Sequence, residues 1–179
     1  MKVVFEKDGK KGEKFIITDS YSLKNGRGIF AGSNIKSFSS DLSSLTNGDY
    51  MFYNCTGLTS FICPSLSKNV DVEEDDAGNT AYAMFYNCTS LMSFDSDLSK
   101  VADGRYMFYN CYNLTPEFYD DLSKLKNADY MFYNCFYDNA VSMTLSLSST
   151  SFSNVVHANH MAAAGGWPFF NFAFDLSSL

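Results

Sequence analysis

The chain has 179 residues, of which 46% are hydrophobic, which suits one folded domain or one short repeat array. Its formal net charge of −7 argues against a nucleic-acid partner, because such partners are held by Lys and Arg side chains that neutralise phosphates. No segment approaches the roughly 18 uninterrupted apolar residues of a membrane-spanning helix, so no membrane insertion is expected.

The start of the chain predicts a β-hairpin. Two short alternating segments within residues 2–18 flank the turn pair Asp8 and Gly9. The first repeat of a repeat stack has no neighbour to cover it, so we expect residues 1–23 to form a capping hairpin. The same segment lacks the apolar core of a signal peptide.

Repeated strings dominate the middle of the chain. The pentapeptide Met-Phe-Tyr-Asn-Cys occurs at 51–55, 84–88, 107–111 and 131–135, and a degenerate copy occupies 29–32. A second pattern, Asp-Leu-Ser-x-(Leu/Val), recurs at 41–45, 97–101, 121–125 and 175–179. Between them lie Leu-x-x-Phe stretches at 58–63 and 91–96, and a version with one extra residue at 114–118. These patterns predict a repeat array over residues 24–139.

The combined pattern resembles the BspA-type leucine-rich repeats of bacterial surface proteins, over roughly residues 24–135. The resemblance implies an α/β-type repeat solenoid, a right-handed coil with a short-strand parallel sheet on one face and turns or short helices on the other. It also implies a role in adhesion or in binding host proteins.

Alternation along each Leu-x-x-Phe stretch points Phe61 and Cys63 inward and their neighbours outward. The inward positions hardly change between repeats, whereas the residue after the strand Phe is Ser39, Ile62, Asp95 and Tyr119 in successive repeats. The outward residues are therefore the candidate partner-binding face: Ser60, Ile62, Ser93, Asp95, Glu117 and Tyr119.

The repeated pentapeptide is interpreted as scaffold. Its Phe residues are expected to stack inward with the Met residues beside them, and its Asn residues to turn inward and hydrogen-bond the backbone of the bend. These sets are Phe52, Phe85, Phe108 and Phe132; Met51, Met84, Met107 and Met131; and Asn54, Asn87, Asn110 and Asn134.

Four of the five cysteines share one repeat position, and the fifth, Cys63, lies in a strand. No Cys-x-x-Cys pair exists, which removes the usual zinc spacing. We expect buried thiols that pack as small hydrophobic groups. Disulfides between successive repeats, favoured in an oxidising compartment, are the alternative.

An acidic insertion at residues 71–76 lengthens one repeat interval to 33 residues. A divalent-cation site there is conceivable, but the run lacks the alternating ligands and turn Gly of a calcium loop. A solvated, protruding loop is the favoured interpretation.

The last quarter, residues 140–179, is expected to form irregular C-terminal repeats or a cap. Residues 153–166 are interpreted as a short helix that presents His157 and His160 on one face, and no third metal ligand stands nearby. Alternating segments at 141–147 and 170–174 suggest two further strands. The final repeat stops part-way at 175–179, which suggests a homo-oligomer contact or a partner at that end.

Nothing in the sequence resembles a nucleophile with its base, a phosphate-binding loop or a pair of catalytic carboxylates. We therefore expect a non-enzymatic, protein-binding module with no catalytic residues, no cofactor and no metal. The alternatives are a structural component of a phage or surface fibre, and a phage-encoded inhibitor of a host protein. Localisation is left open.

Overall fold

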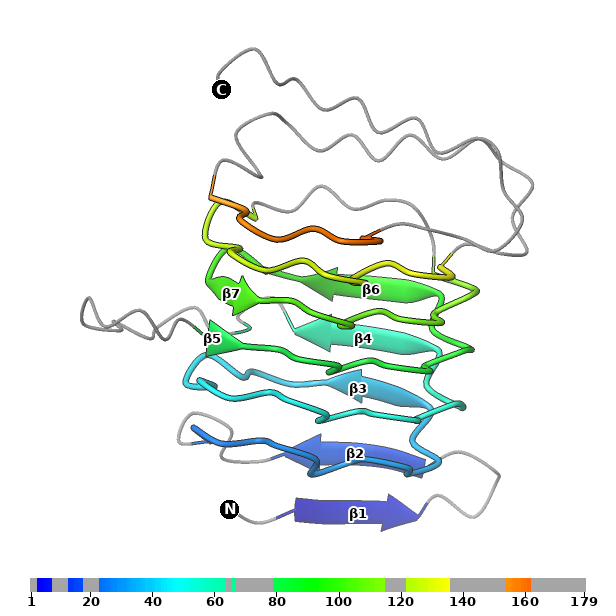
Figure 1. Cartoon of the computed structure of the whole chain (residues 1–179). Helices are drawn as coiled ribbons and strands as arrows, with labels where there is room; N and C mark the ends of the chain where they lie inside the picture. Colours follow the sequence, from blue (N-terminus) through cyan, green and yellow to red (C-terminus); the bar gives the residue numbers. More distant parts are fainter. Residues whose placement is uncertain are drawn as a thin grey trace.

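The computed structural model describes residues 3–7, 13–17, 23–63, 66, 79–114, 122–135 and 154–161. These residues form short strands and turns and contain no helix (Figure 1). The strands are β1 (Val3–Lys7), β2 (Glu13–Ile17), β3 (Ser37–Ser39), β4 (Ser60–Cys63), β5 (Asn79–Thr80), β6 (Ser93–Ser96) and β7 (Val101–Asp103). Among the described residues no helix is long and apolar enough to cross a membrane.

One sheet runs through the stack in the order β1-β2-β3-β4-β6. The first two strands pair antiparallel, which confirms the predicted hairpin, and each later strand joins in parallel. The register places Phe38 beside Phe61 and Phe61 beside Phe94, so each of these three strands contributes one Phe at the same register position. The short parallel sheet implied by the family resemblance is confirmed, and the handedness of the coil stays a prediction.

A second row of parallel pairing follows the stack on the far side of each repeat. Strand β5 pairs with β7, and isolated bridges extend the row in both directions. The row passes through one residue per repeat: Asn25, Asn47, Thr80, Asp103, Asn127 and His157.

The predicted helix around the two histidines is wrong over the described residues 154–161. These residues form turns, and His157 bridges in parallel to Asn127 of the preceding repeat. Backbone N–H groups of the preceding repeat, at Ala128 and Phe132, donate to the carbonyls of His157 and Met161. The backbone N–H groups of the preceding repeat would be left without a partner if residues 154–161 formed a helix. Because buried backbone groups must be paired, this need outweighs the local capping signal that predicted the helix.

The pentapeptide segments form stacked turns rather than strands. Along each segment the backbone N–H groups alternate: one donates to a carbonyl of its own repeat, and the following one donates to a carbonyl of the next repeat. Met51 N–H donates to Gly48 three residues back, at 3.0 Å between N and O, whereas Phe52 N–H donates to Met84 of the next repeat at 2.9 Å. The same alternation recurs at Met84 and Phe85. This pattern satisfies the buried backbone without a helix.

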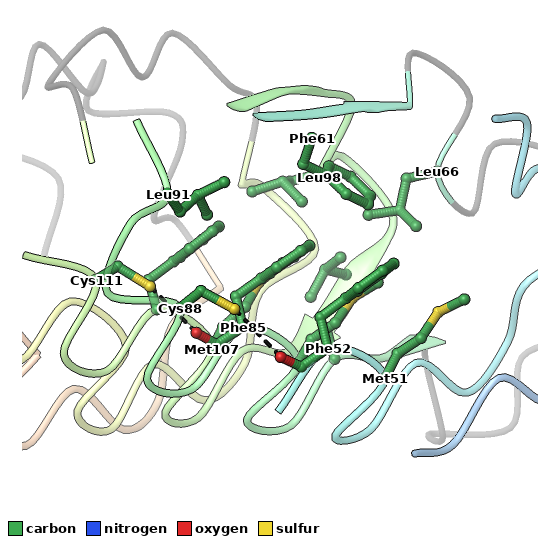
Figure 2. Packing of buried hydrophobic residues seen from close by; sticks show 14 of the residues in the cluster. Met51, Phe52, Phe61, Leu66, Phe85, Cys88, Leu91, Leu98, Met107 and Cys111 are labelled. Atoms are coloured by element: carbon green, nitrogen blue, oxygen red, sulfur yellow. Dashed lines mark hydrogen bonds between the residues drawn. The ribbon is translucent and has the colours of Figure 1, made fainter. Parts of the chain in front are cut away.

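The core lies between these turns and the five-stranded sheet (Figure 2). The predicted inward Phe stack is confirmed: the rings of Phe30, Phe52, Phe85, Phe108 and Phe132 follow one another with centroids 5.2–5.4 Å apart and nearly parallel planes. The Phe residues of the strands meet this stack edge to face, as in the 4.8 Å contact of Phe61 with Phe85. Both ring arrangements are favourable for aromatic pairs.

All five cysteines lie among the described residues as buried thiols, as predicted, and none is in a disulfide. The four pentapeptide cysteines each donate from Sγ to the carbonyl of a Phe in the preceding repeat. The Sγ–O distances are 3.0 Å for Cys55, 3.2 Å for Cys88 and Cys111, and 2.8 Å for Cys135. The repeated Cys is thus a small apolar side chain that also binds neighbouring repeats together.

These thiols are expected to resist alkylation while the protein is folded. Burial raises the pKa of Cys88, Cys111 and Cys135, so little reactive thiolate forms at neutral pH. Mass spectrometry after treatment with a maleimide should find the native protein unmodified and all five thiols modified in denaturant. A Lys100→Cys variant, which adds an exposed thiol, should gain one label at once. Rapid labelling of the native chain at several cysteines would contradict this prediction.

Candidate functional site

The outer surface of the five-stranded sheet carries two rows of side chains. Ser37, Ser60 and Ser93 pair across β3, β4 and β6 in one row. Ser39, Ile62 and Asp95 pair in the other. We call these six residues the sheet face. Its serines are small, so another backbone or a flat protein surface can approach closely.

The sheet face contains four of the six predicted site residues. Ile62 is 38% exposed although it is large and apolar, and Ser93 and Asp95 are exposed. Ser60 is half-buried in the neighbouring strand, where it is registered with Ser93. Glu117 and Tyr119 lie outside the described residues. The predicted inward residues, Phe61 and Cys63, are fully buried, which confirms the alternation.

The turn side carries a surface that the sequence interpretation did not single out. Two adjoining rows of half-buried tyrosines run along the stack, and we call them together the tyrosine face. Successive ring centroids are 5.0–5.6 Å apart in the first row and 4.7–5.0 Å apart in the second. The first row is Tyr50, Tyr82, Tyr106 and Tyr130, and the second is Tyr53, Tyr86, Tyr109 and Tyr133.

A signal for this face was present in the sequence. In each pentapeptide the apolar Met and Phe are buried, and the Tyr that follows is amphipathic, with a hydroxyl that prefers a wet environment. The first row could not be predicted as easily, because Tyr82 stands one position earlier than Tyr50 and Tyr106 do in their repeats, and Ala83 occupies the position equivalent to theirs. The ring of Tyr82 nevertheless fills the gap between theirs.

The repeated Asn residues do not turn inward, so that prediction is wrong. Asn54 is exposed, and the side chains bond to one another along the stack. Nδ2 of Asn87 donates to Oδ1 of Asn54 at 3.0 Å, and the series continues through Asn110 (2.7 Å) and Asn134 (3.1 Å). All four have a positive φ, between 54° and 60°, in a backbone region that Asn tolerates better than most residues.

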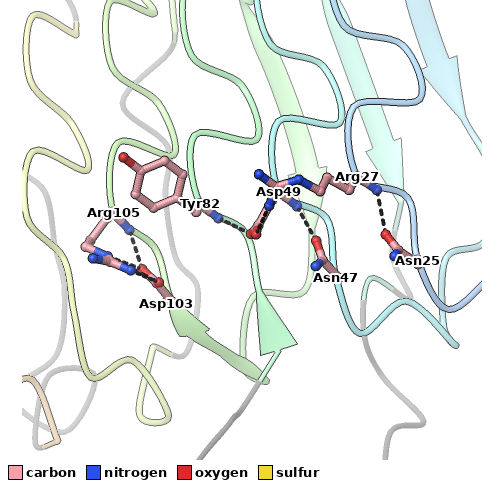
Figure 3. A network of polar contacts seen from close by, with 7 residues as sticks. All are labelled: Asn25, Arg27, Asn47, Asp49, Tyr82, Asp103 and Arg105. Atoms are coloured by element: carbon pink, nitrogen blue, oxygen red, sulfur yellow. Dashed lines mark hydrogen bonds and ion pairs between the residues drawn. The ribbon is translucent and has the colours of Figure 1, made fainter.

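Two ion pairs lie on the turn side, with Tyr82 between them (Figure 3). Nη1 of Arg27 is 3.1 Å from Oδ2 of Asp49, and the guanidinium of Arg105 is 2.6 Å from Asp103. Each guanidinium also lies 5.0 Å from the centre of a tyrosine ring, Arg27 over Tyr50 and Arg105 over Tyr82. The positive charges are therefore held against the aromatic surface.

Crowding of phenols affects their acidity. Burial is the main cause that raises the pKa of Tyr82, Tyr86 and Tyr109, because a phenolate is less well solvated there than in water. The neighbouring tyrosines raise it further, since two phenolates close together would repel each other. These phenols stay protonated to higher pH than free tyrosine does.

The melting temperature should consequently fall in alkaline solution. Because the folded-state pKa of these phenols exceeds the unfolded value of about 10, their stabilising effect is complete below that pH and is lost as the pH rises through the folded pKa. Thermal melts between about pH 9 and 11 should show this loss. The double variant Tyr86→Phe/Tyr109→Phe cannot ionise there and should lose less over the same range. An identical pH dependence in both proteins would refute this explanation.

No metal site is evident in the described part of the chain, where no three His, Cys, Asp or Glu side chains cluster suitably. His157 and His160 are exposed, and the His160 ring stacks on Tyr130 with centroids 5.0 Å apart, which extends the first tyrosine row. The acidic insertion at 71–76 lies outside the described residues.

Comparison with family models gives one match. A model described as a BspA type leucine rich repeat region, in six copies, matches residues 11–75 and 80–162. Comparison with curated proteins and with solved structures finds no match.

Proposed function

The chain belongs to the BspA-type leucine-rich repeat family, and we propose that it binds a protein partner on its sheet face. Repeats of this kind are typical of protein-binding modules and are generally non-enzymatic. The finer part of the proposal is an adhesion-like role or the capture of a host protein, as the family resemblance implies.

The observation that carries this proposal is the contrast between the two sides of the same strands. Inward, successive strands present Phe38, Phe61 and Phe94 at one register position. Outward, the next register position changes from Ser39 to Ile62 to Asp95. A core needs the repetition, whereas a surface that recognises one particular partner needs the variety.

Ile62 is the expected anchor of the contact. It combines an exposed apolar side chain with small or polar neighbours in the adjoining strands, Ser39 and Asp95. An apolar side chain that becomes desolvated at the centre of an interface, with polar residues around it, provides much of the binding energy in protein complexes.

The test compares two isoleucines of equal exposure. Ile62 and Ile29 are both 38% exposed, but only Ile62 belongs to the sheet face. With a partner isolated from host extract by affinity capture, Ile62→Lys should weaken binding at least about tenfold in calorimetry. Ile29→Lys should leave it within about twofold, and both variants should keep the parent melting temperature within a few degrees.

Unchanged affinity in the Ile62 variant would refute the sheet face as the binding site. An equal loss in the Ile29 variant would show that added positive charge, rather than the position of the change, affects capture.

A further inference from the structure

On the turn side, one residue of each repeat directly precedes a residue with positive φ, and these preceding residues lie at equivalent positions along the stack. These positive-φ residues, each the first of its kind in its repeat, are Gly28, Tyr50, Ala83, Tyr106, Tyr130 and His160. The residues before the first five form the row named here the charged row: Arg27, Asp49, Tyr82, Arg105 and Asp129. Along the stack this row reads positive, negative, aromatic, positive, negative.

That order is complementary to itself when it is reversed. If a second copy lies antiparallel with Tyr82 opposite Tyr82, then Arg27 faces Asp129 and Asp49 faces Arg105, in both directions. A shift of one repeat either way brings like charges together, Arg27 opposite Arg105 or Asp49 opposite Asp129. A parallel arrangement in register opposes every charge with its own kind. Only one register is favourable at all four charged positions.

The row has the regular spacing that such a match requires. Parallel bridges join Asn25 to Asn47 and Asn47 to Thr80, and β5 continues to β7. The stacking is therefore continuous from Asn47 to Thr80, and each member of the charged row lies one repeat from the next. Two copies can consequently match at all five positions at once.

The side chains needed for this contact reach the surface. The side chain of Arg27 is 57% exposed and that of Arg105 is 41% exposed, although each already contacts a carboxylate in its own chain. A guanidinium has five N–H donors, so each of these two arginines can donate to a second carboxylate. Asp129 is half-buried, and Asp49, whose side chain is 14% exposed, contributes least.

The tyrosine face supplies the apolar part of the same surface. Its half-buried phenol rings adjoin the charged row, to which Tyr82 also belongs, and Tyr and Arg are among the residues enriched in protein interfaces. From the charge order and this surface we propose that the tyrosine face and the charged row form a two-fold symmetric, antiparallel interface with a second copy of this chain.

This interface is separate from the sheet face. The Phe stack of the turns packs directly against the Phe residues of the strands, so the two surfaces face away from each other across the core. Dimerisation and partner binding can therefore fail independently in experiments.

Sedimentation velocity of the full chain over a wide concentration range tests the proposal. The parent chain should form a dimer. A variant with Arg27→Asp and Arg105→Asp has an entirely negative charged row and should be monomeric. The opposite variant, Asp49→Lys with Asp129→Lys, should also be monomeric alone, and an equimolar mixture of the two should recover the dimer. Lys100→Asp with Lys124→Asp makes the same change in net charge at exposed positions outside the row and should stay dimeric.

Circular dichroism establishes that each variant is folded before the comparison. Asp49 and Asp129 accept backbone N–H groups, from Tyr82 at 3.0 Å and Asn159 at 2.6 Å, so their variant is the one at risk of misfolding. In that case the arginine variant and the lysine control still decide the question. A monomeric parent chain, a dimeric arginine variant or a mixture of folded variants that stays monomeric would each overturn the proposal.

Discussion

Replacement of Phe85 by Ala is expected to lower the free energy of unfolding by about 3–5 kcal/mol. The ring of Phe85 is fully buried and contacts four others. It stacks at 5.4 Å on the equivalent rings of both neighbouring repeats, and it meets the strand residues Phe61 and Phe94 edge to face at 4.8 and 5.5 Å. Its removal leaves a cavity where the turns and the sheet are held together.

The expected loss is a large part of the stability of an ordinary domain, which is about 5–15 kcal/mol. Phe85→Leu is the matched control, because it keeps most of the buried apolar surface and should cost roughly 1.5 kcal/mol or less. Urea denaturation followed by circular dichroism measures both. A loss below about 1 kcal/mol for the Ala variant would contradict the central position of this ring.

The second large effect is expected in the Asn ladder, at Asn110. Its side chain donates to Asn87 and accepts from Asn134, and its φ is 60°. Asn110→Ala removes two hydrogen bonds, each worth about 0.5–1 kcal/mol at a partly exposed site, and adds about 1–2 kcal/mol of left-handed backbone strain. The free energy of unfolding should fall by about 2–4 kcal/mol in total.

Glycine at the same position separates the two causes. Asn110→Gly also loses the hydrogen bonds, but Gly adopts a positive φ without the steric penalty, so it should be about 1 kcal/mol more stable than the Ala variant. Equal stability of the two variants would refute the backbone contribution. A Gly variant as stable as the parent would refute the contribution of the ladder.

Much of the scaffold could be predicted because identical residues at a repeated position must have equivalent surroundings. Once Phe occupies that position in successive repeats, an inward stack is the arrangement that buries the most apolar surface. The same reasoning predicted the buried thiols, and period-2 alternation predicted that Phe61 and Cys63 are buried and Ile62 is exposed.

The Asn residues show where this reasoning fails. A buried turn needs hydrogen-bond partners, which favoured inward amides, but the stack brings another Asn within 2.7–3.1 Å of each amide at the surface. Asn87 has two such partners, Asn54 and Asn110, which lie 33 and 23 residues away in the sequence. No pattern local to one repeat contains that information.

The sequence by itself therefore determined the family, the repeat, the inward aromatic residues and the outward residues of β4 and β6. Those features depend on the period of the chain and on whether each side chain prefers water. Only the tertiary structure decided that His157 joins a stacked turn instead of a helix, that the amides bond to each other, and that the tyrosines form a continuous face beside the charged row. Each of these depends on contacts between repeats, where the backbone and side chains of one repeat complete those of the next.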